Sequence, residues 1–171
     1  MQAARGTSLN RWIVPSVGAG SYLLDVGVKT LAVHRLDDGD VHVLGDWFVL
    51  HLTRNAGAAF STGTQYTVAL SCLAAVALVV VLSLSRRAGD RVWSVAFGLL
   101  AGGIAGNLTD RLFRDPGPLR GHVVDMFMVP HWPVFNVADI CINIAAGLIV
   151  LQTFRGVSLD GSRRAATSGT G

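Results

Sequence analysis

The stretch VALSCLAAVALVVVLSL, residues 68–84, decides the fold. It contains no ionisable side chain except the thiol of Cys72. Its length is close to the roughly 20 residues that a helix needs to cross the hydrocarbon of a bilayer. A run of this length and composition predicts a membrane-spanning helix that faces lipid and anchors the chain.

Three further apolar runs surround this stretch, and together they predict four spans at residues 12–33, 66–85, 92–108 and 134–154. The whole chain has the same character, because 51% of its 171 residues are hydrophobic, only 15% are charged and the mean hydropathy is +0.48. We therefore expect an all-α membrane protein with a single domain over residues 1–157. Residues 158–171 are rich in Gly, Ser, Thr and Arg and are expected to form a disordered cytoplasmic tail.

The arginines are distributed unevenly between the two sides of the predicted spans, and basic residues favour the cytoplasmic side. One side has eight, namely Arg5, Arg11, Arg86, Arg87, Arg91, Arg155, Arg163 and Arg164. The other side has five, namely Arg35, Arg54, Arg111, Arg114 and Arg120. Both termini are therefore predicted to be cytoplasmic. The pI of about 9.4 then reflects a positive surface that faces anionic lipid, and it gives no reason to expect a nucleic-acid partner.

The first long loop contains VHVLGDWFVLHLT, residues 41–53, in which β-branched and aromatic residues flank a Gly45-Asp46 turn. This pattern predicts a small extracytoplasmic β-hairpin. Trp47, Phe48 and, in a later loop, Trp132 have the amphipathic character expected at the level of lipid headgroups. Anchoring at the membrane interface is the simpler interpretation, and contact with a substrate is the alternative.

Two features of the spans favour helix packing. Gly98, Gly102 and Gly106 recur every fourth residue, which predicts a face on which a second helix backbone approaches closely. Cys72 and Cys141 lie inside predicted spans, where a thiol usually behaves as a small apolar side chain. We expect no disulfide between them.

Polar residues at membrane depth point to a functional site, because ionisable groups are costly there. Asn107, Asp110 and Arg111 stand at the end of the third run with spacings that place them on one helical face. Asn136, Asp139 and Asn143 repeat this arrangement in the fourth run. If that helix begins near residue 134, Asp139 lies about 7 Å inside its outer end. Such a carboxyl needs a partner or a proton.

Asp125, in the apolar string 122–128 of the preceding loop, is the carboxylate that the sequence places best to meet Asp139. Two carboxyls held close in a low-dielectric site do not both ionise easily, so one keeps a proton while the other acts as a base. Such a pair can hydrolyse a peptide bond by activating water and stabilising the carbonyl oxygen. The sequence does not decide which aspartate plays which part.

Alternatives from other classes remain open at this point. A small proton-coupled transporter or channel also places Asp and Arg in membrane helices, and a noncatalytic scaffold would explain the glycines. A structural alternative is that the aspartates are helix-end residues, each satisfied by an Arg or an Asn. Zinc hydrolysis of the H-E-x-x-H type is excluded because the chain has no Glu, and neither a metal nor another cofactor is expected.

Four strings carry a resemblance that covers most of the chain: NAGAAF at 55–60, GGIAGNLTDR at 102–111, VVDMF at 123–127 and FNVAD at 135–139. In this order they resemble the lipoprotein signal peptidases, also called type II signal peptidases. The resemblance implies an aspartic endopeptidase with Asp125 and Asp139 as its catalytic pair. It also implies residues that bind substrate or support the pair: Asp25, Asn55, Gly57, Asn107, Arg111 and Asn136.

The resemblance further implies the biological setting. The expected substrate is a prolipoprotein that is cut just before a cysteine carrying a diacylglyceryl group, in the bacterial cytoplasmic membrane near its outer face. Membrane lipids are the other expected partner, and a monomer is expected. Asp110 is expected to stabilise the fold. One departure is visible, since the family commonly has D-Q-x-x-K in the first span, whereas Val26 follows Asp25 here and Lys29 is retained.

Overall fold

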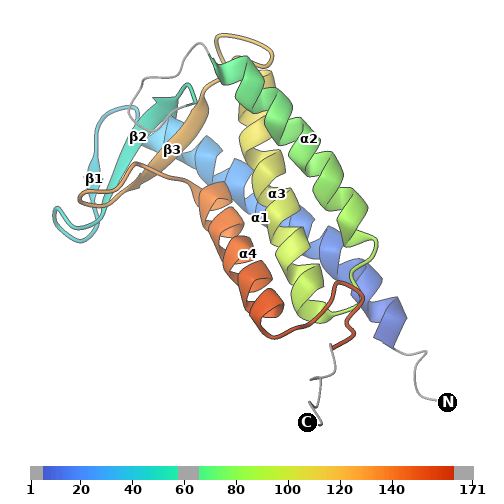
Figure 1. Cartoon of the computed structure of the whole chain (residues 1–171). Coiled ribbons are helices and arrows are strands. Elements are labelled where there is room, and N and C mark those ends of the chain that lie inside the picture. Colours follow the sequence, from blue (N-terminus) through green and yellow to red (C-terminus); the bar gives the residue numbers. More distant parts are fainter. Residues whose placement is uncertain (1–5, 58–65, 164–171) are drawn as a thin grey trace.

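The structure, a computed structural model, describes residues 6–57 and 66–163. Within these residues the chain forms four helices and one small antiparallel sheet (Figure 1). The elements, in order, are α1 (Gly6–Arg35), β1 (Val41–His42), β2 (Val49–Asn55), α2 (Thr67–Ser85), α3 (Arg91–Phe113), β3 (Val123–Met128) and α4 (Val137–Phe154). The predicted helical architecture with a small β element is confirmed.

Three of the helices, α2, α3 and α4, are long and apolar enough to cross a membrane. The helix α1 has 30 residues but carries Asp25 and Lys29 in its second half, and it is not among these three. Length and composition therefore support three of the four predicted spans. The first span is a helix as predicted, and its crossing of the membrane remains a prediction.

The helix α3 lies at the centre of the bundle and packs against α1, α2 and α4, whereas α1 and α2 barely touch each other. The glycines of α3 make the approach of α1 possible. A Cβ atom on Gly102 would lie 1.9 Å from Ser21 Oγ, and one on Gly106 would lie 2.3 Å from Asp25 Oδ2. The predicted close helix contact is thus confirmed, and it is what allows Asp25 to reach the centre of the bundle.

Two of the helix boundaries that differ from the predicted ones lie near the predicted polar residues. The helix α3 continues to Phe113 instead of ending at residue 108, so that Asn107 and Arg111 both lie within it. The helix α4 begins at Val137 instead of residue 134, because Asn136 has an extended backbone and its side chain accepts a hydrogen bond from the Asp139 backbone N–H. Asp139 therefore lies in the first turn of α4, less deep than the predicted 7 Å.

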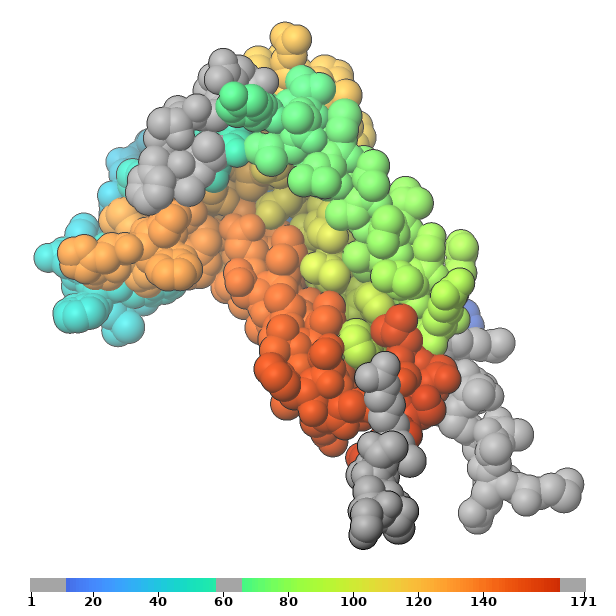
Figure 2. Space-filling view, viewed as in Figure 1, coloured from blue at the N-terminus to red at the C-terminus, as the bar shows by residue number. Residues whose placement is uncertain are grey.

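The predicted hairpin is confirmed, since β1 pairs antiparallel with β2 in the register Val41 to Leu50. The sheet has a third strand that was not predicted, because residues 122–128 were assigned to a loop. This strand, β3, pairs antiparallel with β2, and its Val124 and Met126 side chains are buried against α1. Figure 2 shows the strands projecting from the helical bundle beyond α4.

The start of the predicted tail is ordered. Residues 157–163 fold back against the connection between α2 and α3, where Trp93 Nε1 donates to the Val157 carbonyl at 3.1 Å and the Gly89 N–H donates to the Leu159 carbonyl at 2.8 Å. Residues 158–163 thus belong to the folded part, and the rest of the predicted tail lies outside the described residues. This segment lies at the same end of the bundle as the beginning of α1, opposite the sheet (Figure 1).

Candidate active site

A short return of the chain brings the third strand and the fourth helix together. After β3 the chain turns back so that Phe135 pairs with Phe127, with N–H to carbonyl distances of 2.8 and 3.1 Å in the two directions. The two rings lie 5.6 Å apart between centroids. This pairing places Asn136, and with it the start of α4, directly beside Asp125 in β3.

Asn136 links the two predicted aspartates. Its side-chain Nδ2 donates to Asp125 Oδ1 at 2.6 Å, and its backbone N–H donates to Asp139 Oδ2 at 3.2 Å. Its Oδ1 accepts from the Asp139 N–H at 2.9 Å. Because one fully buried side chain contacts both residues, the sequence-distant Asp125 and the helix residue Asp139 are held in a fixed relation. The structure brings this pair together.

Both aspartates face one pocket of about 470 Å³. Asn55 and Asn143 add polar groups to its lining. The rest of the lining is apolar and comes from the loop before α4 and from the first turns of that helix: Trp132, Pro133, Val134, Phe135, Ile140 and Ile144. A mostly apolar cavity with a few convergent polar groups is the usual form of a binding site for an apolar substrate.

Asp125 is 2% exposed, and Asn55 holds its second oxygen. Asn55 Nδ2 donates to Asp125 Oδ2 at 3.1 Å, while its own Oδ1 accepts from the Gly57 N–H at 2.9 Å. Gly57 has φ +126, and a Cβ atom there would lie 2.8 Å from Leu70 Cδ1, so only glycine fits. Burial, together with the negative charge of Asp139, raises the pKa of Asp125 to about 6 against the opposing hydrogen bonds of the two asparagines.

Asn107 supports the other aspartate from the last third of α3. Its Nδ2 donates to Asp139 Oδ1 at 2.9 Å. Its Oδ1 accepts from Lys29 Nζ at 2.8 Å and from Asn136 Nδ2 at 3.1 Å. Two donors on the oxygen fix the orientation of the amide, so that its NH₂ group points at Asp139.

Lys29 lies behind the pair and is fully buried. Its Nζ lies 2.8 Å from Asp25 Oδ2 and 2.8 Å from Asp110 Oδ2, in addition to Asn107. A buried ammonium needs such surroundings because an uncompensated charge is strongly destabilising. Lys29 was not among the predicted site residues and stood only in the D-Q-x-x-K pattern of the family. Its spacing of four residues from Asp25 on one helix was the available signal.

The two carboxylates around Lys29 also join other elements. Asp25 Oδ1 accepts from the Ala138 N–H in the first turn of α4 at 2.8 Å. Asp110 accepts from the Val124 N–H in β3 at 3.2 Å and pairs with Arg114. Asp25 and Asp110 therefore tie α1, α3, β3 and α4 together behind the pocket, and neither lines it.

Arg111, on the same face of α3, brings a positive charge close to both Asp125 and Asp139. Its Nη1 donates to the Asn107 carbonyl at 3.3 Å. Its Nε is buried and has no hydrogen-bond partner among the described residues. Of the predicted supporting residues, the three asparagines donate hydrogen bonds to the pair and Arg111 lies close to it. Gly57 donates its N–H to Asn55, and Asp25 lies behind the pocket.

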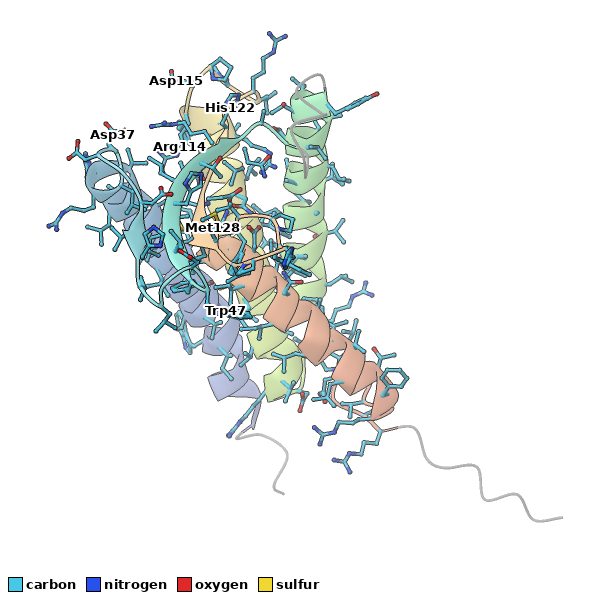
Figure 3. All side chains as sticks on the ribbon, turned by 90° about the vertical axis from the view of Figure 1, so that its left-hand side faces the viewer. Asp37, Trp47, Arg114, Asp115, His122 and Met128 are labelled. Atoms are coloured by element: carbon cyan, nitrogen blue, oxygen red, sulfur yellow. The ribbon has the colours of Figure 1, made fainter. Side chains whose placement is uncertain are left out.

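The predicted interfacial aromatic residues divide into two kinds. Phe48 packs against Phe127 with ring centroids 5.9 Å apart and thus helps hold the sheet together. Trp47 is 78% exposed at the turn of the hairpin, and Trp132 is exposed at the pocket. Figure 3 shows that, along the length of the bundle, Trp47 lies closer to the middle than Asp115 and His122 do. Those two residues lie at the end of the bundle that carries the sheet.

Two carboxyls that share one pocket can act together as an acid and a base, and here they lie beside a bundle in which α2, α3 and α4 are long and apolar enough to cross a membrane. Among the residues with described positions, no group of three His, Cys, Asp or Glu side chains could hold a metal ion. The fold is that of a bacterial membrane enzyme whose structure was solved by the in meso method at 2.3 Å. That structure has a TM-score of 0.70 at 20% identity and covers 90% of this chain and 94% of its own.

Residues 18–155 match the family model described as signal peptidase (SPase) II. The lipoprotein signal peptidase of Streptomyces coelicolor is 43% identical over 86% of this chain and 72% of its own length. That of Mycobacterium avium is 45% identical over 85% of this chain and 80% of its own length. The chain belongs to the signal peptidase II family, and the resemblance found in the sequence is confirmed.

Proposed function

We propose that this chain cleaves diacylglyceryl-modified prolipoproteins just before the lipidated cysteine, with Asp125 and Asp139 as its catalytic pair. Membership of the signal peptidase II family supports signal-peptide cleavage from prolipoproteins. The single observation that supports the pair best is Asn136, which contacts both carboxyls at the edge of one pocket. No observation favours the transporter or scaffold alternatives.

The proposed chemistry uses one proton shared between the two carboxyls. The ionised member takes a proton from a water molecule as the water oxygen bonds to the scissile carbonyl carbon. The protonated member donates a hydrogen bond to the carbonyl oxygen and stabilises the charge that develops there. When the C–N bond breaks, the carboxyl that took a proton from water gives that proton to the leaving amine. The new carboxyl end remains on the signal peptide.

The supporting residues then have distinct proposed roles. Asn55, Asn107 and Asn136 hold the carboxyls in place, in agreement with their hydrogen bonds to Asp125 and Asp139. Arg111 would lower the energy of negative charge in the site. Gly57 would shape the turn that presents Asn55. Asp25 would act at a distance, by pairing with Lys29 behind the pocket.

The proposed topology has four spans, with both termini in the cytoplasm and the pocket near the extracytoplasmic face. Its support is the position of the pocket at the sheet end of the bundle, whereas Arg86, Arg87 and Arg155 lie at the opposite end (Figure 1). In this orientation Trp47 and Trp132 would lie at the level of the lipid headgroups. The acyl chains of a substrate could then stay in the bilayer while its scissile bond reaches water.

The proposed assembly is a monomer in the bacterial cytoplasmic membrane. Its support is that, among the described residues, Asn55, Asn107 and Asn136 already donate hydrogen bonds to all four carboxyl oxygens of the two aspartates. No surface of a second copy is needed to complete the pocket.

The test is cleavage of a purified prolipoprotein, in its diacylglyceryl-modified and unmodified forms, by the purified full-length protein in detergent. Mass spectrometry should locate the cut immediately before the modified cysteine and find little or no cut in the unmodified form. Equal cleavage of both forms, or a cut at another bond, would contradict the proposed specificity.

A further inference from the structure

A second and larger pocket, of about 920 Å³, lies between α1, α2 and α3. It exists because both α1 and α2 pack on α3 while barely touching each other. It shares no lining residue with the pocket of Asp125 and Asp139. It reaches the connection between α2 and α3, at the end of the bundle away from the sheet (Figure 1). No residue with a proposed catalytic or supporting role lines it.

The length of this groove is apolar. On the α3 side it is lined by Ala101, Gly102 and Ala105, which have small side chains or none. One wall comes from α1, with Val14 and Ala19 among its residues, and the other comes from α2, with Leu78 and Leu82. In a bilayer such a surface must be covered by hydrocarbon, because water there is unfavourable.

One end of the groove is charged. Arg86 and Arg87 line it there, both are exposed, and neither forms an ion pair with another described residue. Asp160 also lines this end, but its Oδ1 accepts hydrogen bonds from the Ser162 N–H and hydroxyl at 2.9 and 2.7 Å. The two arginines and Asp160 together give this end of the groove a net charge of +1. It therefore favours an anion over a cation.

We infer that this groove binds an anionic phospholipid, with an acyl chain along α3 and the phosphate beside Arg86 and Arg87. A basic pocket between membrane helices next to an apolar surface is the chemistry that recognises such a headgroup. In the orientation proposed above, the lipid belongs to the cytoplasmic leaflet. The inference is independent of the catalytic role of the two aspartates.

A helix of a partner protein fits the groove less well. A helix about 10 Å across fills about 2,400 Å³ over the thickness of the hydrocarbon, so it would enter the groove only in part. The cytoplasmic end of a membrane helix also tends to carry Lys or Arg, which Arg86 and Arg87 would repel. An acyl chain with a phosphate avoids both difficulties.

The test is native mass spectrometry of the full-length protein, titrated in a mild detergent with phosphatidylglycerol or with phosphatidylcholine of the same acyl chains. We expect phosphatidylglycerol to bind at least fivefold more tightly. In the double variant Arg86→Gln/Arg87→Gln this preference should disappear, because each arginine near an anionic headgroup contributes about fivefold in affinity. Arg155→Gln is the matched control, since Arg155 is exposed at the end of α4 and outside the groove.

A second pair of variants tests the apolar part. Ala19→Phe should fill the groove and weaken the binding of both lipids, whereas Ala146→Phe, on an exposed face of α4, should not. Equal affinity for the two lipids would overturn the inference. So would an Arg155→Gln effect as large as that of the double variant, unchanged binding in Ala19→Phe, or a copurified membrane peptide that competes with the lipid.

Discussion

Replacing Lys29 with Met should destabilise this protein by about 3–5 kcal/mol while leaving the pocket lining intact. Lys29 Nζ lies 2.8 Å from Asp25 Oδ2, from Asp110 Oδ2 and from Asn107 Oδ1, and the side chain is fully buried. Met has a similar length and fills the same space, so the change removes the charge and the hydrogen bonds with little loss of packing.

The expected magnitude follows from the charges that remain. Asp110 keeps Arg114 as a partner, whereas Asp25 loses its only ion-pair partner among the described residues. An uncompensated buried carboxylate destabilises a protein by about 3–5 kcal/mol. In the double variant Lys29→Met/Asp25→Asn that carboxylate is gone, so we expect the double variant to be more stable than Lys29→Met alone by at least about 1 kcal/mol.

The assay is reversible unfolding in mixed micelles, followed by circular dichroism, for the wild type, Lys29→Met, Asp25→Asn and the double variant. Thr30→Met is the matched control, because Thr30 is exposed on the same helix and the change should stay within about 0.5 kcal/mol. A loss of under 1 kcal/mol in Lys29→Met would refute the reasoning. A double variant that shows the plain sum of its two single changes would also refute it.

Three further predictions concern helix packing, capping and titration. Gly102→Ala should destabilise the fold by about 1–3 kcal/mol, because its Cβ would meet Ser21 Oγ at 1.9 Å. Gly147→Ala is the control and should stabilise the fold slightly, because nothing lies within 4 Å of a Cβ there. Equal unfolding midpoints of these two variants would contradict the prediction. Asn136→Ala should lose about 1–2 kcal/mol from the helix cap and most of the cleavage activity, and wild-type kcat/KM would speak against the bridging role. The pKa of Asp125 is raised to about 6 from its usual 3.8, so its contribution to stability is full below pH 3.8 and is lost as the pH rises through about 6. Infrared titration of its carboxyl band should show a midpoint near 6 that is absent in Asp125→Asn, and a midpoint near 4 would contradict the effect of burial.

Much of the fold could be predicted because membrane helices depend on local composition. The apolar run 68–84 contains almost the whole of α2, and the glycine spacing predicted the face of α3 on which another helix, found to be α1, approaches. The hairpin could be predicted from its turn residues. The strand β3 could not, because its pairing with β2 depends on segments about 70 residues apart, such as Asn55 and Val123.

The candidate pair could be predicted from costly charges near membrane depth and from the family strings, whereas its surroundings could not. The site depends on Asn136 as a helix cap, and a cap becomes visible only when the helix boundary is known. The threefold coordination of Lys29 depends on Asn107, which lies 78 residues away along the chain. The groove between α1 and α2 is a consequence of how three helices pack, and no local pattern carries it.

The most direct test of the catalytic pair is cleavage of a diacylglyceryl-modified prolipoprotein by purified wild type, Asp125→Asn and Asp139→Asn. Each variant should first be shown to unfold at a temperature close to that of the wild type. Asp37→Asn, in an exposed turn after α1, is the control for loss of a carboxylate elsewhere (Figure 3). We predict that both pair variants fold and lose cleavage while the control retains it. Normal cleavage by a folded Asp125→Asn or Asp139→Asn variant would contradict the account.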